Sequence, residues 1–193
     1  KNIGLIDRPD LNVYRLIHAE GDNMPGLIVD YYDGIIVLQA HSVGMYKMRE
    51  QFTEILKELY GDQLKAVYDK SAKTLPFKAD IEPVDQYIYN SKNKINFVTE
   101  YGNKFKVSWV DGQKTGFFID QRENRKLLQY YSKDKDVLNV FGYTGGFSVF
   151  ALAGGAKTVH SVDSSKSAIE LTNENIALNF GSTERHQSFD VDA

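Results

Sequence analysis

The sequence contains no cysteine among its 193 residues. The chain therefore has no disulfide, no thiolate metal ligand and no cysteine nucleophile of its own. It also lacks a long hydrophobic run, because no stretch approaches the roughly 20 apolar residues that a membrane-spanning helix requires. The first residues, KNIGLIDRPD, do not contain the apolar core of a secretion signal. We therefore expect a cytoplasmic protein with no membrane partner.

The sequence also has no excess of positively charged residues. The formal net charge is −3, so the chain has no overall basic field of the kind that attracts nucleic acid, although a local basic patch is compatible with this value. The hydrophobic fraction of 42% and the charged fraction of 25% are typical of a folded globular protein. The four histidines do not have the spacing of metal ligands, so we expect no metal site.

Residues 1–110 have the pattern of a small mixed α/β domain that is rich in hairpins. Apolar and alternating segments between Leu11 and Val43 are broken by the turn sequences GDNMPG and YDG, which predicts strands in hairpins. Met48, Phe52, Ile55, Leu56 and Leu59 then recur at helical spacing on one apolar face, and Gly61 stands where a helix C-cap is expected. The segments LKAVYDKSA and KINFVTEYGNKFKVSWVDG predict further strands.

Residues 111–193 alternate between helix and strand. Asp120, with Glu123 three residues later, predicts the N-cap of a helix whose Leu127, Leu128 and Tyr131 share one side. Strands are predicted at 137–141, in KTVHSVDSS and in RHQSFDVDA. Helices are predicted after the first of these strands and after the second, the latter capped by Ser164 or Ser165 and ending near Gly181. This alternation indicates a parallel sheet, the first half of a doubly wound, Rossmann-like fold.

The stretch VLNVFGYTGGFSVFALAGGA places a glycine-containing turn between the first strand of this sheet and the helix that follows. In such sheets, ligands bind at the carboxyl ends of the strands. Gly142, Gly145 and Gly146 allow the backbone to approach a ligand, and the helix that follows presents free N–H groups to it. Asp163, at the end of the second strand, is close to the roughly 20-residue spacing expected of an acid that binds ribose hydroxyls. Together these features predict a nucleoside cofactor.

The dinucleotide motif GxGxxG does not fit this turn, because Thr144 stands in the place of its second glycine. A Walker phosphate loop does not fit DGQKTG either, since the upstream glycine is missing. A nicotinamide or flavin cofactor, and with it a nucleotide-dependent oxidoreductase, stays open only as an alternative.

Three segments carry a family resemblance: DGQKTGFFIDQRENR, VLNVFGYTGGFSVFA and VHSVDSSKSAIELTNENIALN. They resemble the class I S-adenosylmethionine-dependent methyltransferases that form 5-methylcytosine in bacterial large-subunit (23S) ribosomal RNA, in the branch that carries a PUA domain. The resemblance is strong over 104–193, and the hairpin-rich part is similar, less specifically, to the RNA-associated central domain of that family. It implies S-adenosylmethionine as cofactor and ribosomal RNA as partner.

The resemblance also implies roles for single residues. Asp163 would hold the ribose hydroxyls of the cofactor, although it could instead merely cap the helix that follows. Asp192 matches the acid that meets the adenine amino group, although at the end of this chain it could simply be solvated. The residues that would line the methionine and ribose part of the cofactor are Phe141, Gly142, Tyr143 and Gly145.

Three further cofactor-binding candidates come from the same resemblance. Asn139 occupies the position where class I enzymes usually carry an acidic residue, and this variant is the one that the resembled branch shows. Gln121 and Arg122 match a pair that lies over the cofactor, where Arg122 could pair with the methionine carboxylate. Without the motif, Gln121, Arg122 and Arg125 have the pattern of surface residues at the start of a helix.

Catalysis is where this chain departs from the family. Enzymes of the resembled kind add a cysteine thiolate to carbon 6 of cytosine, which makes carbon 5 nucleophilic, and an Asp-Pro-Pro loop helps to position the base. This chain contains neither, so we predict no catalytic residue in it. We interpret it as an internal fragment of a methyltransferase, inactive by itself. The alternatives are a noncatalytic RNA-binding or interaction module and, within methyltransferases, a branch that modifies guanine.

Half of a doubly wound sheet exposes an apolar edge and uncovered faces. We therefore expect the isolated chain to form a homodimer or to bind its cofactor weakly and in part.

Overall fold

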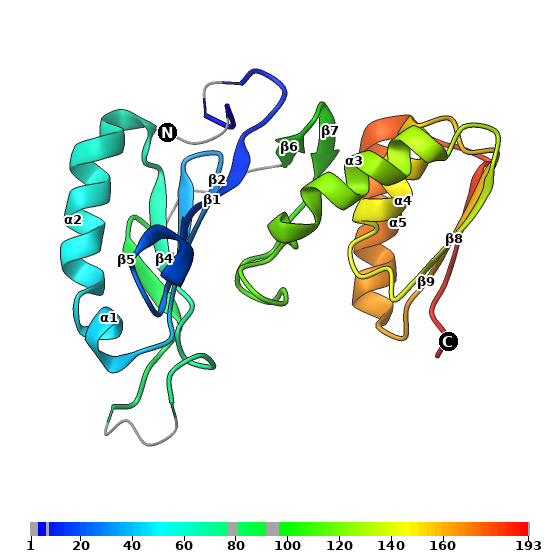
Figure 1. Ribbon diagram of the computed structural model, residues 1–193. Helices are drawn as coiled ribbons and strands as arrows, with labels where there is room; N and C mark the ends of the chain where they lie inside the picture. Colours follow the sequence, from blue (N-terminus) through cyan, green and yellow to red (C-terminus); the bar gives the residue numbers. More distant parts are fainter. Residues whose placement is uncertain (1–3, 7, 77–80, 92–96, 193) are drawn as a thin grey trace. The chain divides into compact units, whose positions relative to one another are not determined.

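The computed structural model describes residues 4–6, 8–76, 81–91 and 97–192 (Figure 1). The predicted α/β class is confirmed, since the chain combines helices with parallel and antiparallel strand pairs. Contacts divide the chain into two compact units, of which the first comprises Lys1–Asn96 and Ser108–Ile119 and the second Phe97–Val107 and Asp120–Ala193. The first unit therefore includes residues 108–119 and the second includes residues 97–107, so the division between the units does not fall at residue 110. The assignment of 1–110 and 111–193 to two functional domains stays a prediction.

The first unit is built on a five-stranded sheet in which β3 and β4 are parallel and the other neighbours are antiparallel. The chain order matches the spatial order, and helices α1 and α2 connect β3 to β4. The strands are β1 (Val13–His18), β2 (Leu27–Tyr32), β3 (Ile35–Ala40), β4 (Ala66–Asp69) and β5 (Gln86–Tyr89), and the helices are α1 (Val43–Lys47) and α2 (Arg49–Tyr60), with single 3-10 turns at Ala19–Asp22 and Gly61–Gln63.

The hairpin between β2 and β3 forms at the predicted YDG turn. Asp33 and Gly34 both have positive φ, 46° and 89°, as a two-residue hairpin turn requires. The side chain that Gly34 lacks would place a Cβ 2.5 Å from the carbonyl oxygen of Gln63. Asp-Gly therefore fixes the register of these two strands.

Helix α2 packs against the sheet of the first unit and ends at Gly61, as predicted. Phe52 and Leu56 enter the core that β2, β3 and β4 share. Ile55 and Leu59 are 51% and 72% exposed, so the prediction of one apolar face was right for only part of the set. Phe52 and Leu56 lie on the line of the helix that faces the sheet, whereas Ile55 and Leu59 lie on the neighbouring line that faces solvent, and Met48 is 46% exposed.

The second unit contains a short hairpin, three helices and a parallel sheet with the spatial order β10-β9-β8. Figure 1 shows the three helices on one side of that sheet. The elements are β6 (Val98–Glu100), β7 (Asn103–Phe105), α3 (Arg122–Tyr131), β8 (Asp136–Val140), α4 (Gly146–Ala153), β9 (Thr158–Val162), α5 (Lys166–Phe180) and β10 (His186–Phe189), with a 3-10 turn at Ile119–Gln121 before α3.

The parallel sheet has one covered face and one bare face. Leu138 on β8 is 64% exposed, and Phe189 on β10 is 40% exposed. Val140, Val162 and Phe189 are register partners, so all three strands end at the same level. The predicted half of a doubly wound sheet is therefore present, with its carboxyl edge formed by the residues that follow these three.

Helix α3 corrects two predictions. Gln121, not Asp120, stands at its N-cap, and the cap carries no side-chain hydrogen bond. The buried residues of α3 are Arg122 and Arg125, whereas Leu127 is 55% exposed. The cause is an ion pair that apolar periodicity does not register. Both guanidinium groups, three residues apart on one face of the helix, donate to the fully buried carboxylate of Glu100 on β6.

Tyr131, which was also predicted on the apolar side of this helix, is 64% exposed. Glu100 accepts from Arg125 through both carboxylate oxygens, at 2.7 and 3.0 Å, and from Arg122 Nε at 3.2 Å. Because removal of one partner would leave a buried charge uncompensated, this triad fixes how α3 attaches to the hairpin β6–β7.

Candidate cofactor-binding site

The turn after β8 has an unusual backbone. Phe141, Tyr143 and Gly145 have positive φ values of 56°, 47° and 73°. For the two aromatic residues this conformation costs on the order of 1 kcal/mol or more each. Gly142 N–H donates to the carbonyl of Val162 at 3.0 Å, which ties the turn to the end of β9. We call residues 141–146 the bend.

Glycine is required at one position of the bend for a steric reason. A Cβ on Gly145 would lie 2.6 Å from Cγ2 of Thr172 on α5, closer than real contacts permit. Helix α4 begins at the next residue, and its N-cap, Gly145, has no side chain with which to cap it. The first-turn N–H groups of a helix have no partner within the helix. This end of α4 can therefore accept a polar or anionic group from a ligand.

Asp163 joins the bend to the loop after β9. One carboxylate oxygen accepts the N–H of Tyr143 at 2.9 Å, and the other accepts the N–H of Ser165 at 2.9 Å. Ser165 in turn caps α5 through Ala168 N–H, as predicted. Asp163 thus supports the loop before the helix and at the same time contacts the bend. The two features on which the predicted nucleoside site rests lie in direct contact.

Helix α5 holds the bend from below through two buried polar side chains. Thr172 Oγ1 donates to the carbonyl of Tyr143 at 2.9 Å, and Asn175 Nδ2 donates to the carbonyl of Thr144 at 2.9 Å. Both side chains are fully buried. The sequence alone assigned no role to either residue. The available signal was a pair of polar residues, three apart, on the buried face of an amphipathic helix.

A chain of polar contacts runs between the sheet and α4. Asn139 Nδ2 donates to Ser148 Oγ at 2.9 Å, Ser148 and Ser161 share a hydrogen bond of 2.6 Å, and Ser161 Oγ lies 2.9 Å from His186 Nε2. Burial, and to a smaller extent the charge of His160, lowers the pKa of His186. This favours the neutral ring at pH 7, as suits a half-buried imidazole beside the hydroxyl of Ser161. The amide of Asn139 therefore lies on the helix-covered face of the sheet, beneath the bend.

The other predicted residues are placed less decisively. Phe141 is 77% exposed, whereas Gly142 is buried and Tyr143 is half-buried. Asp192 is exposed and follows the end of β10, at the same edge of the sheet as Asp163.

Gln121 and Arg122 are engaged locally. Gln121 accepts from Asn124 at 2.9 Å and donates to Asp120 at 3.4 Å. Arg122 is buried and donates to Glu100, which corrects the reading of this residue as a surface charge. The roles of both residues toward a cofactor stay predictions.

The described residues contain no group of three His, Cys, Asp or Glu that is arranged to hold a metal ion. In the same part of the chain, every helix is too short or too polar to cross a membrane.

Comparison with known proteins decides the family. A model of the S-adenosylmethionine-dependent methyltransferases matches residues 15–190. The chain belongs to this family. The family cofactor is S-adenosylmethionine, which confirms that prediction and replaces the nicotinamide alternative.

Named relatives and solved structures agree with the family. The chain is 37% identical over 188 residues to ribosomal RNA large subunit methyltransferase I of Alteromonas mediterranea, covering 97% of this chain and 47% of that protein. Its fold matches a proposed S-adenosylmethionine-dependent methyltransferase from Streptococcus mutans with a TM-score of 0.83, at 28% identity over 96% of this chain and 47% of the other. A second solved chain, a proposed methyltransferase complexed with S-adenosylhomocysteine, gives a TM-score of 0.82 at the same identity and coverage.

The chain spans about half the length of the curated relatives that it matches. The family match nevertheless runs through both compact units, since it begins within β1 and ends just after β10.

The residues of the bend fit the methyl donor of this family. A carboxylate at the end of β9 is the group expected to accept hydrogen bonds from ribose hydroxyls. The glycine at 145 lets Thr172 of α5 pack against the bend, and the uncapped start of α4 offers N–H donors. The carboxylate of Asp163 and the N–H donors of the bend therefore suit an adenosyl ligand.

Proposed function

We propose that this chain is the cofactor-binding part of a methyltransferase that modifies ribosomal RNA, with carbon 5 of cytosine as the target atom. The observation that carries the proposal is the contact between Asp163 and the bend, because it assembles a ribose acceptor and a ligand-accessible backbone at one sheet edge. The relative from Alteromonas mediterranea, whose name states a ribosomal RNA substrate, supports the choice of RNA.

Within this proposal the residues of the chain bind and orient, and they do not react. S-adenosylmethionine, when bound, supplies an electrophilic methyl group on a sulfonium. Asp163 would hold the ribose, Asp192 would meet the adenine amino group, and Phe141, Gly142, Tyr143 and Gly145 would enclose the methionine side. Asn139 donates to Ser148 on α4 and would support the start of that helix from the covered face of the sheet.

The resemblance implies a place for Arg122 and its neighbour Gln121 over the cofactor. Arg122 donates to Glu100, and its guanidinium would pair with the methionine carboxylate as well.

Because this chain contains no cysteine, methylation at carbon 5 requires a thiolate from outside these 193 residues. The same fact favours one alternative, a noncatalytic RNA-binding module built on the same fold. Mass spectrometry of nucleosides from large-subunit ribosomal RNA, treated with the complete gene product and S-adenosylmethionine, separates the two. The proposal predicts 5-methylcytidine, whereas a methylated guanosine or no product would contradict it.

Cofactor binding is tested on the chain itself by calorimetry with S-adenosylhomocysteine. Asp163→Asn removes the charge but keeps the shape, and we expect a loss of affinity of about 10-fold or more, the usual value of a hydrogen bond to a charged group. Asp136→Asn is the matched control, since Asp136 lies at the opposite end of β8 and is exposed. Equal affinities for the two variants would refute the assignment of the site.

The exposed face of the parallel sheet supports the prediction that the isolated chain self-associates. Leu138 and Phe189 expose apolar surface there, beside the half-buried Val140 and Val162. Light scattering on a size-exclusion column should show a dimer that Leu138→Lys converts to a monomer. A parent chain that stays monomeric at high concentration would contradict this expectation.

A further inference from the structure

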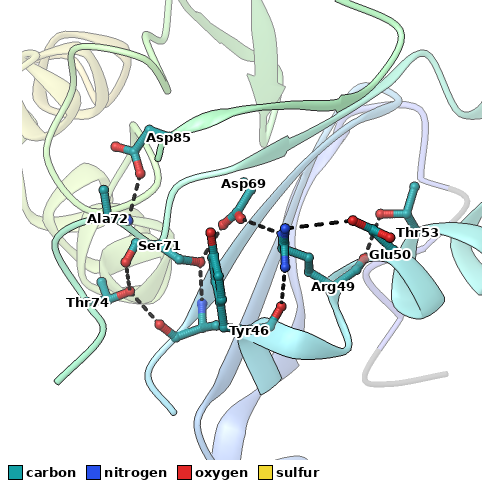
Figure 2. A network of polar contacts seen from close by, with 10 residues as sticks. Tyr46, Arg49, Glu50, Thr53, Asp69, Ser71, Ala72, Thr74 and Asp85 are labelled. Carbon is teal, nitrogen blue, oxygen red and sulfur yellow. Dashed lines mark hydrogen bonds and ion pairs between the residues drawn. The ribbon is translucent and has the colours of Figure 1, made fainter. Parts of the chain in front are cut away.

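Each compact unit contains buried polar side chains that join segments distant in the sequence. In the first unit, Ser71 Oγ accepts the N–H of Ala40 at 2.9 Å, and Thr74 Oγ1 donates to the carbonyl of Ala40 at 2.6 Å (Figure 2). The fully buried carboxylate of Asp69 accepts the hydroxyl of Ser71. These contacts hold the loop after β4, which lines a cleft of about 490 Å³ together with the end of β3 and residues 110–114. This network therefore fixes one loop of the first unit.

In the second unit, Asn175 of α5 joins two parts of the structure with one side chain. Its Nδ2 donates to the carbonyl of Thr144 in the bend at 2.9 Å, and its Oδ1 accepts the N–H of Lys106, directly after β7, at 2.7 Å. The residue is fully buried. An amide side chain carries a donor and an acceptor in fixed geometry without a net charge. Asparagine therefore suits a buried position between a carbonyl and an N–H group.

The contact with Thr144 satisfies a carbonyl in irregular backbone. Tyr143 and Gly145, on either side of this buried residue, have φ values of 47° and 73°, so the chain follows neither a helix nor a strand here. Backbone carbonyls in such a turn need donors from other elements. Helix α5 supplies them, through Asn175 to Thr144 and through Thr172 to Tyr143.

Asn179, four residues later on α5, holds the hairpin β6–β7 in a similar way. Its Oδ1 accepts the N–H of Lys104 at 2.8 Å, and its Nδ2 donates to the carbonyls of Lys104 and Asn175, both at 2.7 Å. Among the described residues, its side-chain hydrogen bonds run to the hairpin and to α5, and none runs to the bend. Of the two asparagines, Asn175 is therefore the one that connects the hairpin to the bend.

The other strand of the hairpin holds Arg122. Glu100 on β6 is fully buried, accepts from Arg122 Nε at 3.2 Å, and is the register partner of Asn103 on β7. Phe105 of β7 stacks on Phe150 of α4, with ring centroids 6.1 Å apart. The hairpin is thus attached to α3, α4 and α5 at once.

These contacts form a continuous link between two parts of the proposed cofactor site. The link runs from the bend through Asn175 to β7, across the hairpin to Glu100, and on to Arg122. In the proposed function, the bend and Asp163 hold the adenosyl half of S-adenosylmethionine, and Arg122 pairs with its carboxylate. Because one ligand must reach both groups, its affinity depends on the spacing between them.

We propose that Asn175 is a positioning residue that sets the spacing between the bend and Arg122, and thereby the preference of the site for ligands that carry the amino-acid carboxylate. The inference rests on the proposed function. It adds a residue that acts through the hairpin β6–β7 rather than by contact with the ligand.

Calorimetry with two ligands tests this role. S-adenosylhomocysteine carries the amino-acid carboxylate, whereas 5′-methylthioadenosine keeps the adenosine and the sulfur without it. The parent chain should bind S-adenosylhomocysteine about 10-fold or more tightly than 5′-methylthioadenosine, the usual value of a hydrogen bond to a charged group. Asn175→Ser shortens the side chain so that it cannot reach both partners. We expect it to lower the affinity for S-adenosylhomocysteine about 10-fold and that for 5′-methylthioadenosine less than about threefold.

Asn179→Ser is the matched control, with the same substitution on the same helix and a contact with the same hairpin. Because Asn179 binds Lys104 rather than the bend, this variant should keep the parent ratio of the two affinities. A merely structural role of Asn175 would lower both affinities equally and leave their ratio unchanged. That result would overturn the inference.

A second measurement uses the parent chain and does not depend on how well a variant folds. Hydrogen exchange at the amide of Lys106 should slow severalfold when S-adenosylhomocysteine binds. The change should be smaller with 5′-methylthioadenosine, because this ligand does not engage Arg122. Equal protection by the two ligands would overturn the inference.

The two proposals fail in different ways. A parent chain that binds neither ligand would refute the proposed function, and this inference with it. A parent chain that binds both ligands with equal affinity would overturn the inference and leave the adenosyl site standing.

Discussion

Both compact units have polar groups at the carboxyl ends of parallel strands. In one unit these groups belong to the backbone, and in the other they belong to side chains. At the edge of β8–β9–β10 the backbone forms the site. It provides three residues with positive φ, among them a glycine that sterics require, and a helix start without a side-chain cap. At the edge of β3–β4 the polar groups are charged side chains on loops that hydrogen bonds hold in place. A backbone-built site suits a ligand that approaches the main chain closely.

The difference also predicts how each edge responds to mutation. A backbone-built site depends on residues that cannot change size, so substitution should cost stability and ligand affinity together. At a side-chain-built edge, substitution of an exposed lysine should leave the fold intact, whereas loss of a buried anchor beneath it should cost stability. Four variants sharpen this contrast.

Gly145→Ala should have the largest effect. The new Cβ would meet Thr172 at 2.6 Å, and alanine would be held at a φ of 73°. Overpacking and left-handed strain together predict about 2–4 kcal/mol of lost stability by chemical denaturation, with loss of S-adenosylhomocysteine binding. Gly102→Ala is the control, because Gly102 has a φ of 79° but open space around its Cβ. A Gly145 variant no less stable than this control would contradict the steric account.

Thr115→Val tests how the segment that carries Lys114 is anchored within the first unit. Thr115 donates to the fully buried carboxylate of Asp30 at 2.5 Å and shares a hydrogen bond of 2.8 Å with Tyr32. Valine keeps the volume and removes the donor, so we expect a loss of about 1.5–3 kcal/mol in the free energy of unfolding. Thr115→Ser should retain most of the stability. Unchanged stability in the valine variant would show that Arg15 alone satisfies Asp30.

The two edges also differ in how far the sequence alone predicts them. The bend, Asp163 and the Ser165 cap lie in one continuous stretch whose glycines and periodicity carry local signals, and all three are where the sequence predicted them. The cleft at the edge of β3–β4 combines residues from 39–41, 70–74 and 110–114, so no local pattern announces it. The buried arginines of α3 were misread because a single distant carboxylate, Glu100, decides their burial.

Thr172→Val tests the support of the bend from α5. The Tyr143 carbonyl would lose its donor while staying in place, which predicts a loss of about 1 kcal/mol and a drop of a fewfold in S-adenosylhomocysteine affinity. Thr172→Ser restores the hydroxyl and serves as the rescue. If serine and valine behaved alike, the hydrogen bond would be irrelevant to the site.

The smallest effect is a pH dependence from His186. Because its pKa is lowered in the folded state, the unfolded state takes up a proton first as the pH falls below about 6.5. The stability contribution of the neutral ring is therefore full above that pH and declines below it, until the pH passes the folded pKa. Thermal unfolding between pH 7.5 and 5 should show this decline, and His186→Asn should flatten it. A parent curve as flat as that of the variant would show that His186 does not contribute to the pH dependence of stability.

The central claim is that the bend after β8 and Asp163 together hold the adenosyl half of S-adenosylmethionine. A crystal structure of this chain with S-adenosylhomocysteine tests it most directly. The account predicts ribose hydroxyls within about 2.6–3.2 Å of the Asp163 carboxylate and the methionine part along residues 141–145. Density for the ligand elsewhere, with Asp163 still bound only to Tyr143 and Ser165, would contradict it.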